Sequence, residues 1–401
     1  MTKKSILIIG GGPSALMLAA LLDERKFEIA ILEKGAAPAR KFLVAGDGGF
    51  NVTHSEPLEQ FITRYTPSSF LEKSIRSFTN DDFRRWLSAI GIETFVGTSK
   101  RIFPIAGIRP IDVLNTILKI ISKKEIPIKP KNTWKGWNEN NELIIDHNYK
   151  DHIVKADIIV FAMGGGSWAK TGSDGSWLNL FAAKGIETIP FQPSNCAYEV
   201  RWEEKFITEE EGMPLKNIAV FCNGKEKKGE VVLTKLGIEG GAVYALSPEI
   251  RKQLNEKSKA TIFLDLKPTL SLTEIKKRLA NRGKKSLSTV LNDALNLTKL
   301  QIALLKTILT KEEFTQPAVL ATKIKQLPLQ ITGMAPLDEA ISTVGGIALD
   351  EVDENFQLKK IPHQYAIGEM LDWDAPTGGY LLQASFSMGY YLANKLNNDL
   401  Y

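Results

Sequence analysis

The alternation of apolar and polar residues defines the first elements of the chain. A continuous apolar run at residues 5–9 is typical of a parallel strand that is buried on both faces. Apolar residues then recur with helical spacing from Leu16 to Leu22. A second apolar run follows at residues 28–32. This pattern predicts a strand, a helix and a second strand that belong to one parallel sheet.

Two later apolar runs extend the same pattern far along the chain. The run at residues 157–162 leads into glycines at 164–166, and the run at 365–367 leads into Gly368. A turn at residues 377–380 then precedes a helical pattern from Leu381 to Leu396. A sheet that begins at residue 5 is therefore completed near residue 367. We predict a discontinuous Rossmann-like α/β domain formed by residues 1–190 and 335–401.

The middle of the chain has two different patterns. Short strand-like runs lie at residues 197–200, 218–222 and 230–233, and Asn223-Gly224 is a strong hairpin signal. From Ser271 to about Lys325 the leucines recur at helical spacing. We therefore predict an inserted β domain of residues 191–265 and 326–334, and a helical subdomain of residues 266–325.

The glycines after the first strand match a dinucleotide-binding fingerprint. Gly10, Gly12 and Ala15 occupy the three small positions of G-x-G-x-x-G/A. They allow a tight turn, the close approach of a pyrophosphate to the backbone, and close packing of the helix that follows. Glu33 ends the second strand about 20 residues later, where a carboxylate accepts hydrogen bonds from ribose hydroxyls. This set predicts FAD or NAD, and it disfavours NADP because Glu33 would repel a 2′-phosphate.

The position of the late strands favours FAD over NAD. An NAD domain usually closes within one contiguous stretch, whereas this sheet is completed at the end of the chain. The layout resembles the two-dinucleotide-fold flavoproteins of the glutathione reductase and fumarate reductase type. By that resemblance, Gly368 and Glu369 stand where a Gly-Asp pair binds the ribityl chain, and the following helix points its N-terminus at the flavin. Residues 192–329 contain no second G-x-G-x-x-G, so we expect NAD(P)H to act only as a transient reductant at the open flavin face.

Further segments resemble the YhiN/BaiN-type bacterial flavoprotein family of NAD(P)/FAD-dependent oxidoreductases. The matching segments are residues 10–15, 33–35, 40–41, 51–53, 101–104, 164–175, 237–242, 345–346, 368–372 and 377–380. Phe50 departs from the family, in which many members have a cysteine before the Asn-x-Thr element. A thiol-based role therefore does not apply at this position.

The resemblance implies that residues 45–51 lie near the flavin ring, since glycines let the backbone approach a flat ring. Asn51 either hydrogen-bonds the ring or the substrate, or caps a turn. His54 is a candidate proton donor and Arg101 a candidate partner of an anionic substrate, although both also fit structural roles. Lys41 and its neighbour Arg40 either neutralise the pyrophosphate or form a solvated pair. The predicted cofactor-binding residues are Gly10, Gly12, Pro13, Ser14, Ala15, Glu33, Lys34, Arg40, Lys41, Ala45, Gly46, Gly48, Gly49, Asn51, Gly164, Gly165, Gly368, Glu369, Gly378, Gly379, Tyr380 and Leu381.

Composition narrows the remaining possibilities. Cys196 and Cys222 form no CxxC pair, and we expect buried, inert thiols. The spacing of the four histidines does not predict a metal site. The net charge is +5, and we interpret the basic run at residues 276–285 as a solvated helix face, so nucleic acid is not an expected partner. No apolar stretch approaches the roughly 20 residues of a membrane span, and the first apolar run does not resemble a signal peptide, so we expect a cytoplasmic protein.

These observations predict a function but not a substrate. We expect an FAD-dependent oxidoreductase that acts on an unidentified small organic molecule at the flavin ring. The reaction is either amine or carbon–nitrogen oxidation, or the reduction of an activated carbon–carbon double bond. The alternative is an FAD-binding protein of an RNA-modification or redox-sensing system, without turnover of a small molecule.

Overall fold

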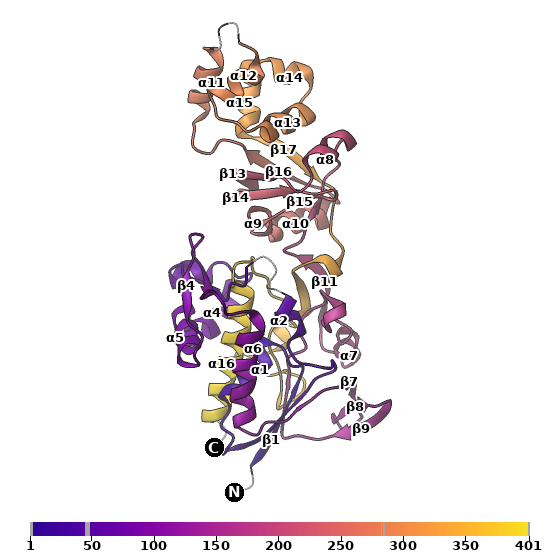
Figure 1. The fold of residues 1–401 in the computed structure, drawn as a ribbon. Helices are drawn as coiled ribbons and strands as arrows, with labels where there is room; N and C mark the ends of the chain where they lie inside the picture. Colours follow the sequence, from indigo (N-terminus) through magenta and orange to yellow (C-terminus); the bar gives the residue numbers. More distant parts are fainter. Residues whose placement is uncertain (1–2, 45–48, 282, 284, 400–401) are drawn as a thin grey trace. The chain divides into compact units, whose positions relative to one another are not determined.

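The computed structural model describes residues 3–44, 49–281, 283 and 285–399. The chain divides into two compact units, which we describe separately (Figure 1). The first unit contains the residues up to Pro193 and those from Leu337 onward, and the second contains Ser194–Pro336. The predicted division into three domains stays a proposal. The boundaries between the two units lie between residues 193 and 194 and between residues 336 and 337.

The first unit is built on a five-stranded parallel sheet with the strand order β20-β10-β1-β2-β6. Its strands are β1 (Lys4–Ile9), β2 (Phe27–Leu32), β6 (Ile128–Lys129), β10 (Ile158–Phe161) and β20 (Gln364–Ala366). The central strands β1 and β10 are almost wholly buried, as their continuous apolar sequences predict. The sheet therefore joins segments from the two ends of the chain, which confirms the predicted α/β fold class.

Three helices pack together beside this sheet in the first unit. Helix α1 (Pro13–Leu21) contacts both α6 (Pro110–Lys123) and the long helix α16 (Tyr380–Asp399) (Figure 1). Gly389 permits the close crossing of α1 and α16, because a Cβ atom there would lie 2.5 Å from the Ser14 carbonyl oxygen. Helices α1 and α16 thereby belong to one packed layer of the fold, with the start of α1 against the middle of α16.

The other elements of the first unit are short. They are α2 (Arg40–Val44), β3 (Thr53–His54), α3 (Leu58–Ile62), α4 (Ser68–Ser77), α5 (Asn80–Ala89), β4 (Thr94–Val96), β5 (Arg101–Pro104), β7 (Asn132–Trp137), β8 (Leu143–His147), β9 (Lys150–Val154), α7 (Leu178–Ala183), β11 (Thr188–Ser194) and β19 (Ser342–Ile347), with single 3₁₀ turns at Ala169–Thr171, Leu337–Glu339 and Leu349–Glu351. Strands β7, β8 and β9 form an antiparallel sheet that the sequence pattern did not predict. The residues of β9 are largely exposed, so they carry no apolar alternation.

The second unit contains a seven-stranded sheet with the order β17-β16-β13-β14-β15-β12-β18. Its strands are β12 (Tyr198–Glu199), β13 (Pro214–Cys222), β14 (Lys225–Leu233), β15 (Gly237–Glu239), β16 (Ala260–Asp265), β17 (Leu327–Ile331) and β18 (Gly333–Met334). The predicted hairpin is confirmed: Cys222 pairs with Lys225, and Asn223 and Gly224 have φ values of 48° and 80°.

Helices complete the second unit. Three of them, α8 (Glu204–Glu210), α9 (Gly241–Tyr244) and α10 (Ser247–Lys257), accompany the sheet. Five more form the predicted helical segment: α11 (Leu272–Ala280), α12 (Leu287–Asp293), α13 (Lys299–Ile308), α14 (Lys311–Thr315) and α15 (Pro317–Lys325). Among the described residues of both units, no helix has the length and apolar character that crossing a membrane requires.

Candidate cofactor and active site

The loops that follow the parallel strands meet at one edge of the sheet. Strands β1, β2, β10 and β20 run in the same direction, so their carboxyl ends lie together. From β1 the chain continues to β2 and β6 on one side, and it returns to β10 and β20 on the other side. Such a reversal of strand order is where open α/β sheets bind ligands. The edge between β1 and β10 is therefore the candidate cofactor site.

Backbone atoms approach each other closely at this edge. Gly10 has a φ of +98°, and a Cβ atom there would lie 2.5 Å from the Ala162 carbonyl oxygen. Gly368 has a φ of +88°, and its Cβ would lie 2.7 Å from the Ser14 hydroxyl oxygen. Gly12 is the residue that precedes α1, and Pro13 starts the helix. A loop without side chains before a helix N-terminus fits a pyrophosphate, which binds to backbone N–H groups.

Glu33 is fixed at the end of β2 by backbone donors. Its Oε2 atom accepts the N–H of Gly11 at 2.9 Å, and its Oε1 atom accepts the N–H of Gly35 at 2.6 Å. These bonds tie the glycine loop to the neighbouring strand. Each carboxylate oxygen keeps a further acceptor site, so the half-buried side chain can still bind ribose hydroxyls.

Two ion pairs join the segments around this edge. The Lys41 ammonium lies 2.9 Å from Glu369 Oε2 and donates to the Ser167 hydroxyl at 2.8 Å. Glu369 also accepts the backbone N–H of Thr343 at 3.1 Å. The Lys34 ammonium pairs with Asp174 at 2.7 Å. Lys41, predicted beside the pyrophosphate, and Glu369, predicted beside the ribityl chain, are thus direct partners.

The N-terminus of α16 is held by side chains. The Tyr380 hydroxyl donates to Glu56 at 2.5 Å, and Arg64 donates two bonds to the same carboxylate at 2.9 and 2.7 Å. The His54 ring stacks on the Tyr380 ring with centroids 5.3 Å apart. The preceding Gly379 has a φ of +99°, and its Cβ would lie 2.4 Å from Thr53 Cα, so the turn passes directly over β3.

The protonation states of this cluster follow from its contacts. Burial acts to raise the pKa of Glu56, but the bonds from Arg64 and Tyr380 outweigh it and lower that pKa below its usual value. Burial raises the pKa of Tyr380, and the bond to Glu56 adds to this effect. Burial lowers the pKa of His54. A neutral His54 agrees with its geometry, because Nδ1 accepts the N–H of Glu56 at 3.1 Å.

A second buried network ties α16 to the rest of the unit. The Thr53 hydroxyl donates to the Gln383 side-chain oxygen at 2.7 Å. The Gln383 amide donates to the Phe78 carbonyl at 2.9 Å and to the Ser387 hydroxyl at 3.0 Å. Gln383 has no exposed surface. Burying its amide is favourable only because these bonds replace those to water, which fixes the direction of the helix.

The other predicted residues lie close to these clusters. Asn51 and Arg101 are half-buried, and a Cβ atom on Gly378 would lie 3.4 Å from Arg101 Nε. A Cβ atom on Gly49 would lie 3.5 Å from the Phe103 ring, whereas the side chain of Arg40 is exposed. The predicted residues that lie outside the described part of the chain are Ala45, Gly46 and Gly48. The residues that sequence reasoning missed are Glu56, Arg64, Ser167, Asp174, Thr343 and Gln383. Of these, Ser167 and Asp174 lie within the matching segment 164–175, which is the one signal that the sequence offered.

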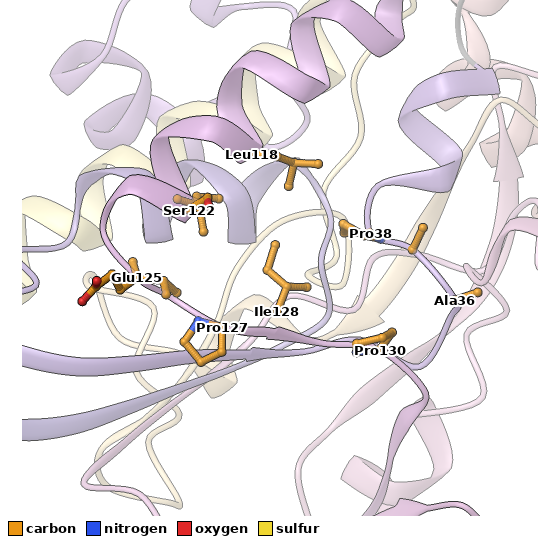
Figure 2. Close-up of a pocket in the computed structure, with 11 residues that line it drawn as sticks. Ala36, Pro38, Leu118, Ser122, Glu125, Pro127, Ile128 and Pro130 are labelled. Atoms are coloured by element: carbon orange, nitrogen blue, oxygen red, sulfur yellow. The ribbon is translucent and has the colours of Figure 1, made fainter.

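A separate pocket lies beside the segment that follows Glu33. It has a volume of about 550 Å³ and is lined by α6, by residues 36–38 and by residues 125–130 (Figure 2). Figure 2 shows Leu118, Pro38 and Ile128 facing this space. The residues that line it are mostly apolar, and they begin three positions after Glu33 along the chain. The pocket therefore adjoins the segment that carries Glu33 without including the glycine loops.

The two cysteines belong to the second unit. Cys196 and Cys222 are buried thiols that form no disulfide, as predicted. Burial raises the pKa of Cys222 to about 11. At neutral pH a thiol with such a pKa is almost entirely protonated, so very little of the reactive thiolate is present.

The comparison with known families identifies the chain. The family described as HI0933-like protein Rossmann domain matches residues 4–395. This chain belongs to that family. The resemblance inferred from the sequence is thereby confirmed, and with it the class of flavin-dependent oxidoreductases.

Relatives and a solved structure agree with this assignment over nearly the whole length. A 3-dehydro-bile acid delta(4,6)-reductase of Clostridium scindens is 23% identical over 96% of both chains. A ribosomal RNA dihydrouridine synthase of Haemophilus influenzae is 23% identical over 98% of both chains. A 3-ketosteroid-delta4-(5alpha)-dehydrogenase of Rhodococcus jostii has the same fold, with a TM-score of 0.50, 11% identity, and coverage of 98% of this chain and 96% of that one.

Proposed function

We propose that the chain is an FAD-dependent reductase of carbon–carbon double bonds that are conjugated to a carbonyl group. The observation that carries the proposal is the glycine-lined switch point of the parallel sheet, which fits a dinucleotide with an adenosine half. The relatives narrow the reaction. A delta(4,6)-reductase and a dihydrouridine synthase both saturate such double bonds, one in a steroid and one in a uracil ring. This chemistry favours double-bond reduction over amine oxidation.

The cofactor contacts divide between the two ends of the site. Gly10, Gly12 and the N-terminus of α1 would bind the pyrophosphate, and Glu33 would bind the adenosine ribose. The ion pair of Lys41 and Glu369 would lie along the ribityl chain, and the N-terminus of α16 would face the ring. A bound flavin supplies the hydride, while the protein positions both reactants and excludes water.

Saturation of a double bond also requires a proton, and the chain places His54, the candidate donor, beside two polar side chains that could orient the substrate. His54 and Arg101 lie on the paired strands β3 and β5, and Asn51 directly precedes β3. His54 is the candidate proton donor, and the fixed Tyr380 ring holds its position; burial lowers its pKa, so the imidazole would have to gain a proton before it could donate one. Arg101 would orient the carbonyl oxygen of the substrate. NAD(P)H would reduce the flavin transiently at its open face.

An anaerobic absorbance experiment tests this function. The purified holoprotein is reduced with light and then mixed with 2-cyclohexen-1-one, a 4-en-3-one steroid, or an RNA that contains uridine. We expect at least one of these compounds to restore the oxidised flavin band near 450 nm and to yield its saturated product. Amines that bleach the oxidised protein, with no reoxidation by the unsaturated compounds, would instead establish an amine oxidase. Inertness toward both panels would favour a flavin-binding protein without small-molecule turnover.

A further inference from the structure

The positive charge of the chain is concentrated in the helical segment of the second unit. Residues 266–325 contain twelve Lys and Arg but only four Asp and Glu, a formal excess of eight positive charges. The other 341 residues contain 39 Lys and Arg against 42 Asp and Glu, an excess of three negative charges. The net charge of +5 therefore originates from this segment alone.

The basic side chains of this segment face solvent. In α11, Ile275 and Leu279 are buried, so Lys276, Lys277 and Arg278 lie on the exposed side of the helix. The other described basic residues with exposed side chains are Lys285, Lys299, Lys306 and Lys311. They lie on or beside helices that contact one another in sequence, from α11 to α15 (Figure 1). One small helical body thus presents all of them.

Few of these charges are neutralised within the fold. Among the described residues, Lys276, Lys277, Lys299, Lys306 and Lys311 have no carboxylate within 4 Å. Most of the acidic residues of the segment are already engaged. Glu274 and Glu313 cap α11 and α14 by accepting the N–H groups of Ser271 and Thr310, and Asp293 pairs with Lys285. A surface of uncompensated ammonium groups attracts a polyanion.

The chemistry of this surface selects the kind of polyanion. Within residues 266–325, the described part of the chain exposes no large apolar side chain, whereas binding to a membrane surface requires apolar residues that enter the lipid. Phe314 is the single aromatic residue of the segment, and the Lys306 ammonium covers its ring at 5.8 Å. The described part of the segment therefore has no exposed aromatic side chain on which an unpaired base could stack. The remaining way to bind a nucleic acid is through phosphate contacts along a double helix.

We propose that helices α11 to α15 bind the phosphate backbone of double-helical RNA. The choice of RNA rests on the proposed function, because the uracil ring has the conjugated double bond that such a reductase would saturate. The basic segment was interpreted from the sequence as a solvated helix face; its unpaired and clustered lysines favour a binding surface instead. The substrate would then be a base of a structured RNA rather than a free small molecule.

The binding test uses the holoprotein and a fluorescein-labelled RNA hairpin with a 20-base-pair stem. Fluorescence anisotropy measures Kd from 50 to 200 mM KCl. We expect log Kd to rise with log [KCl] with a slope of about 3–5, the value for roughly four to six phosphate contacts. Lys276→Gln with Lys277→Gln should weaken binding at least about fivefold at 100 mM KCl and reduce the slope by about 1–2. The matched control, Lys228→Gln with Lys252→Gln, removes two exposed lysines of the same unit and should change Kd less than about twofold.

Each other outcome overturns the proposal. Absence of hairpin binding at 50 mM KCl, or an equal loss in both double variants, would exclude this surface. Equal affinity for a DNA duplex of the same length would contradict the choice of RNA. Tighter binding to phosphatidylserine vesicles or to poly-glutamate would replace RNA by a membrane or an acidic protein. Reoxidation of the reduced flavin by 2-cyclohexen-1-one should be unchanged in both variants. Failure of the unaltered protein to reduce 2-cyclohexen-1-one, the 4-en-3-one steroid and the uridine-containing RNA alike, with RNA binding intact, would refute the proposed function and leave the surface in place.

Discussion

At the carboxyl edge of the parallel sheet the candidate site is made of backbone, whereas at the start of α16 it is made of side chains. Gly10 and Gly368 leave space that a single Cβ atom would fill, and Glu33 arranges the loop through two backbone N–H groups. The other end depends on Glu56 and Tyr380, which are both 5% exposed. The backbone end suits a group common to many enzymes, while the side-chain end can vary with the reaction.

The two kinds of construction should fail in different ways when they are mutated. The contact between Gly10 and the Ala162 carbonyl has no tolerance for an added atom, because neither backbone group can rotate away. A side-chain network loses one bond at a time and keeps the others. The predictions below use this difference, and they run from the largest expected effect to the smallest.

The largest effect is expected for Gly10→Ala. The left-handed conformation costs an L-residue about 1–2 kcal/mol, and the contact with the Ala162 oxygen adds about 1–3 kcal/mol. Urea unfolding should show a loss of about 3 kcal/mol, and the purified protein should contain little flavin. The control is Gly91→Ala, which has a φ of +88° but nothing within 4 Å of the added Cβ. Equal losses in the two variants would mean that crowding at the edge is unimportant.

A smaller effect is expected for Glu33→Arg. The change removes the acceptor of the Gly11 and Gly35 N–H groups and places a cation where ribose hydroxyls would bind. FAD binding to the apoprotein should weaken by about 1–3 kcal/mol, the cost of a lost charge-assisted bond. Fluorescence titration measures this difference. Glu28→Arg, on an exposed position of the same strand, should leave the dissociation constant unchanged. An unaltered affinity in Glu33→Arg would separate Glu33 from the cofactor.

Tyr380→Phe probes the side-chain end. It removes the bond to Glu56 but leaves both bonds from Arg64, so stability should fall by only about 1 kcal/mol. Tyr390→Phe is the matched control, since no hydrogen bond from that hydroxyl is found among the described residues. Chemical denaturation compares the two variants. A loss above about 3 kcal/mol in Tyr380→Phe would show that this end is as intolerant as the glycine edge.

The smallest effect concerns pH. Folding lowers the pKa of His54, so the unfolded chain binds more protons, and stability falls as the pH decreases below about 6.5. One proton changes the unfolding free energy by at most about 1.4 kcal/mol per pH unit. Glu56 acts in the same direction but only below about pH 4.5, since its pKa is also lowered. His54→Gln should flatten the profile between pH 6.5 and 5, whereas the exposed His152→Gln should not. Identical profiles for the two variants would place His54 in a solvated setting.

The difference between the backbone end and the side-chain end of the site also explains which features could be predicted from the sequence. The backbone end could be predicted because its constraints leave glycines in fixed order after apolar strands, as at Gly10 and Gly164. The late apolar runs predicted that strands from both ends of the chain share one sheet, but the exposed strand β9 left no pattern. Glu56 and Gln383 were missed because their partners lie more than 300 positions away in the chain, Tyr380 for Glu56 and Phe78 for Gln383, and only the fold brings them together.

The ion pair of Lys41 and Glu369 shows the same limit of prediction from one sequence. Lys41 and Glu369 were each singled out, one by its place after Glu33 and the other by resemblance. Nothing in a single sequence predicts that two residues 328 positions apart are partners. Their pairing depends on β20 entering the sheet beside β10, which is a property of the whole first unit.

Identification of the released cofactor tests the central claim most directly. The purified protein is denatured, and the flavin in the supernatant is separated by chromatography and quantified against the protein. A glycine edge with an adenosine-binding Glu33 predicts FAD, not FMN, close to one molecule per chain after reconstitution. A colourless protein that takes up no added FAD, or one that releases FMN, would contradict the account.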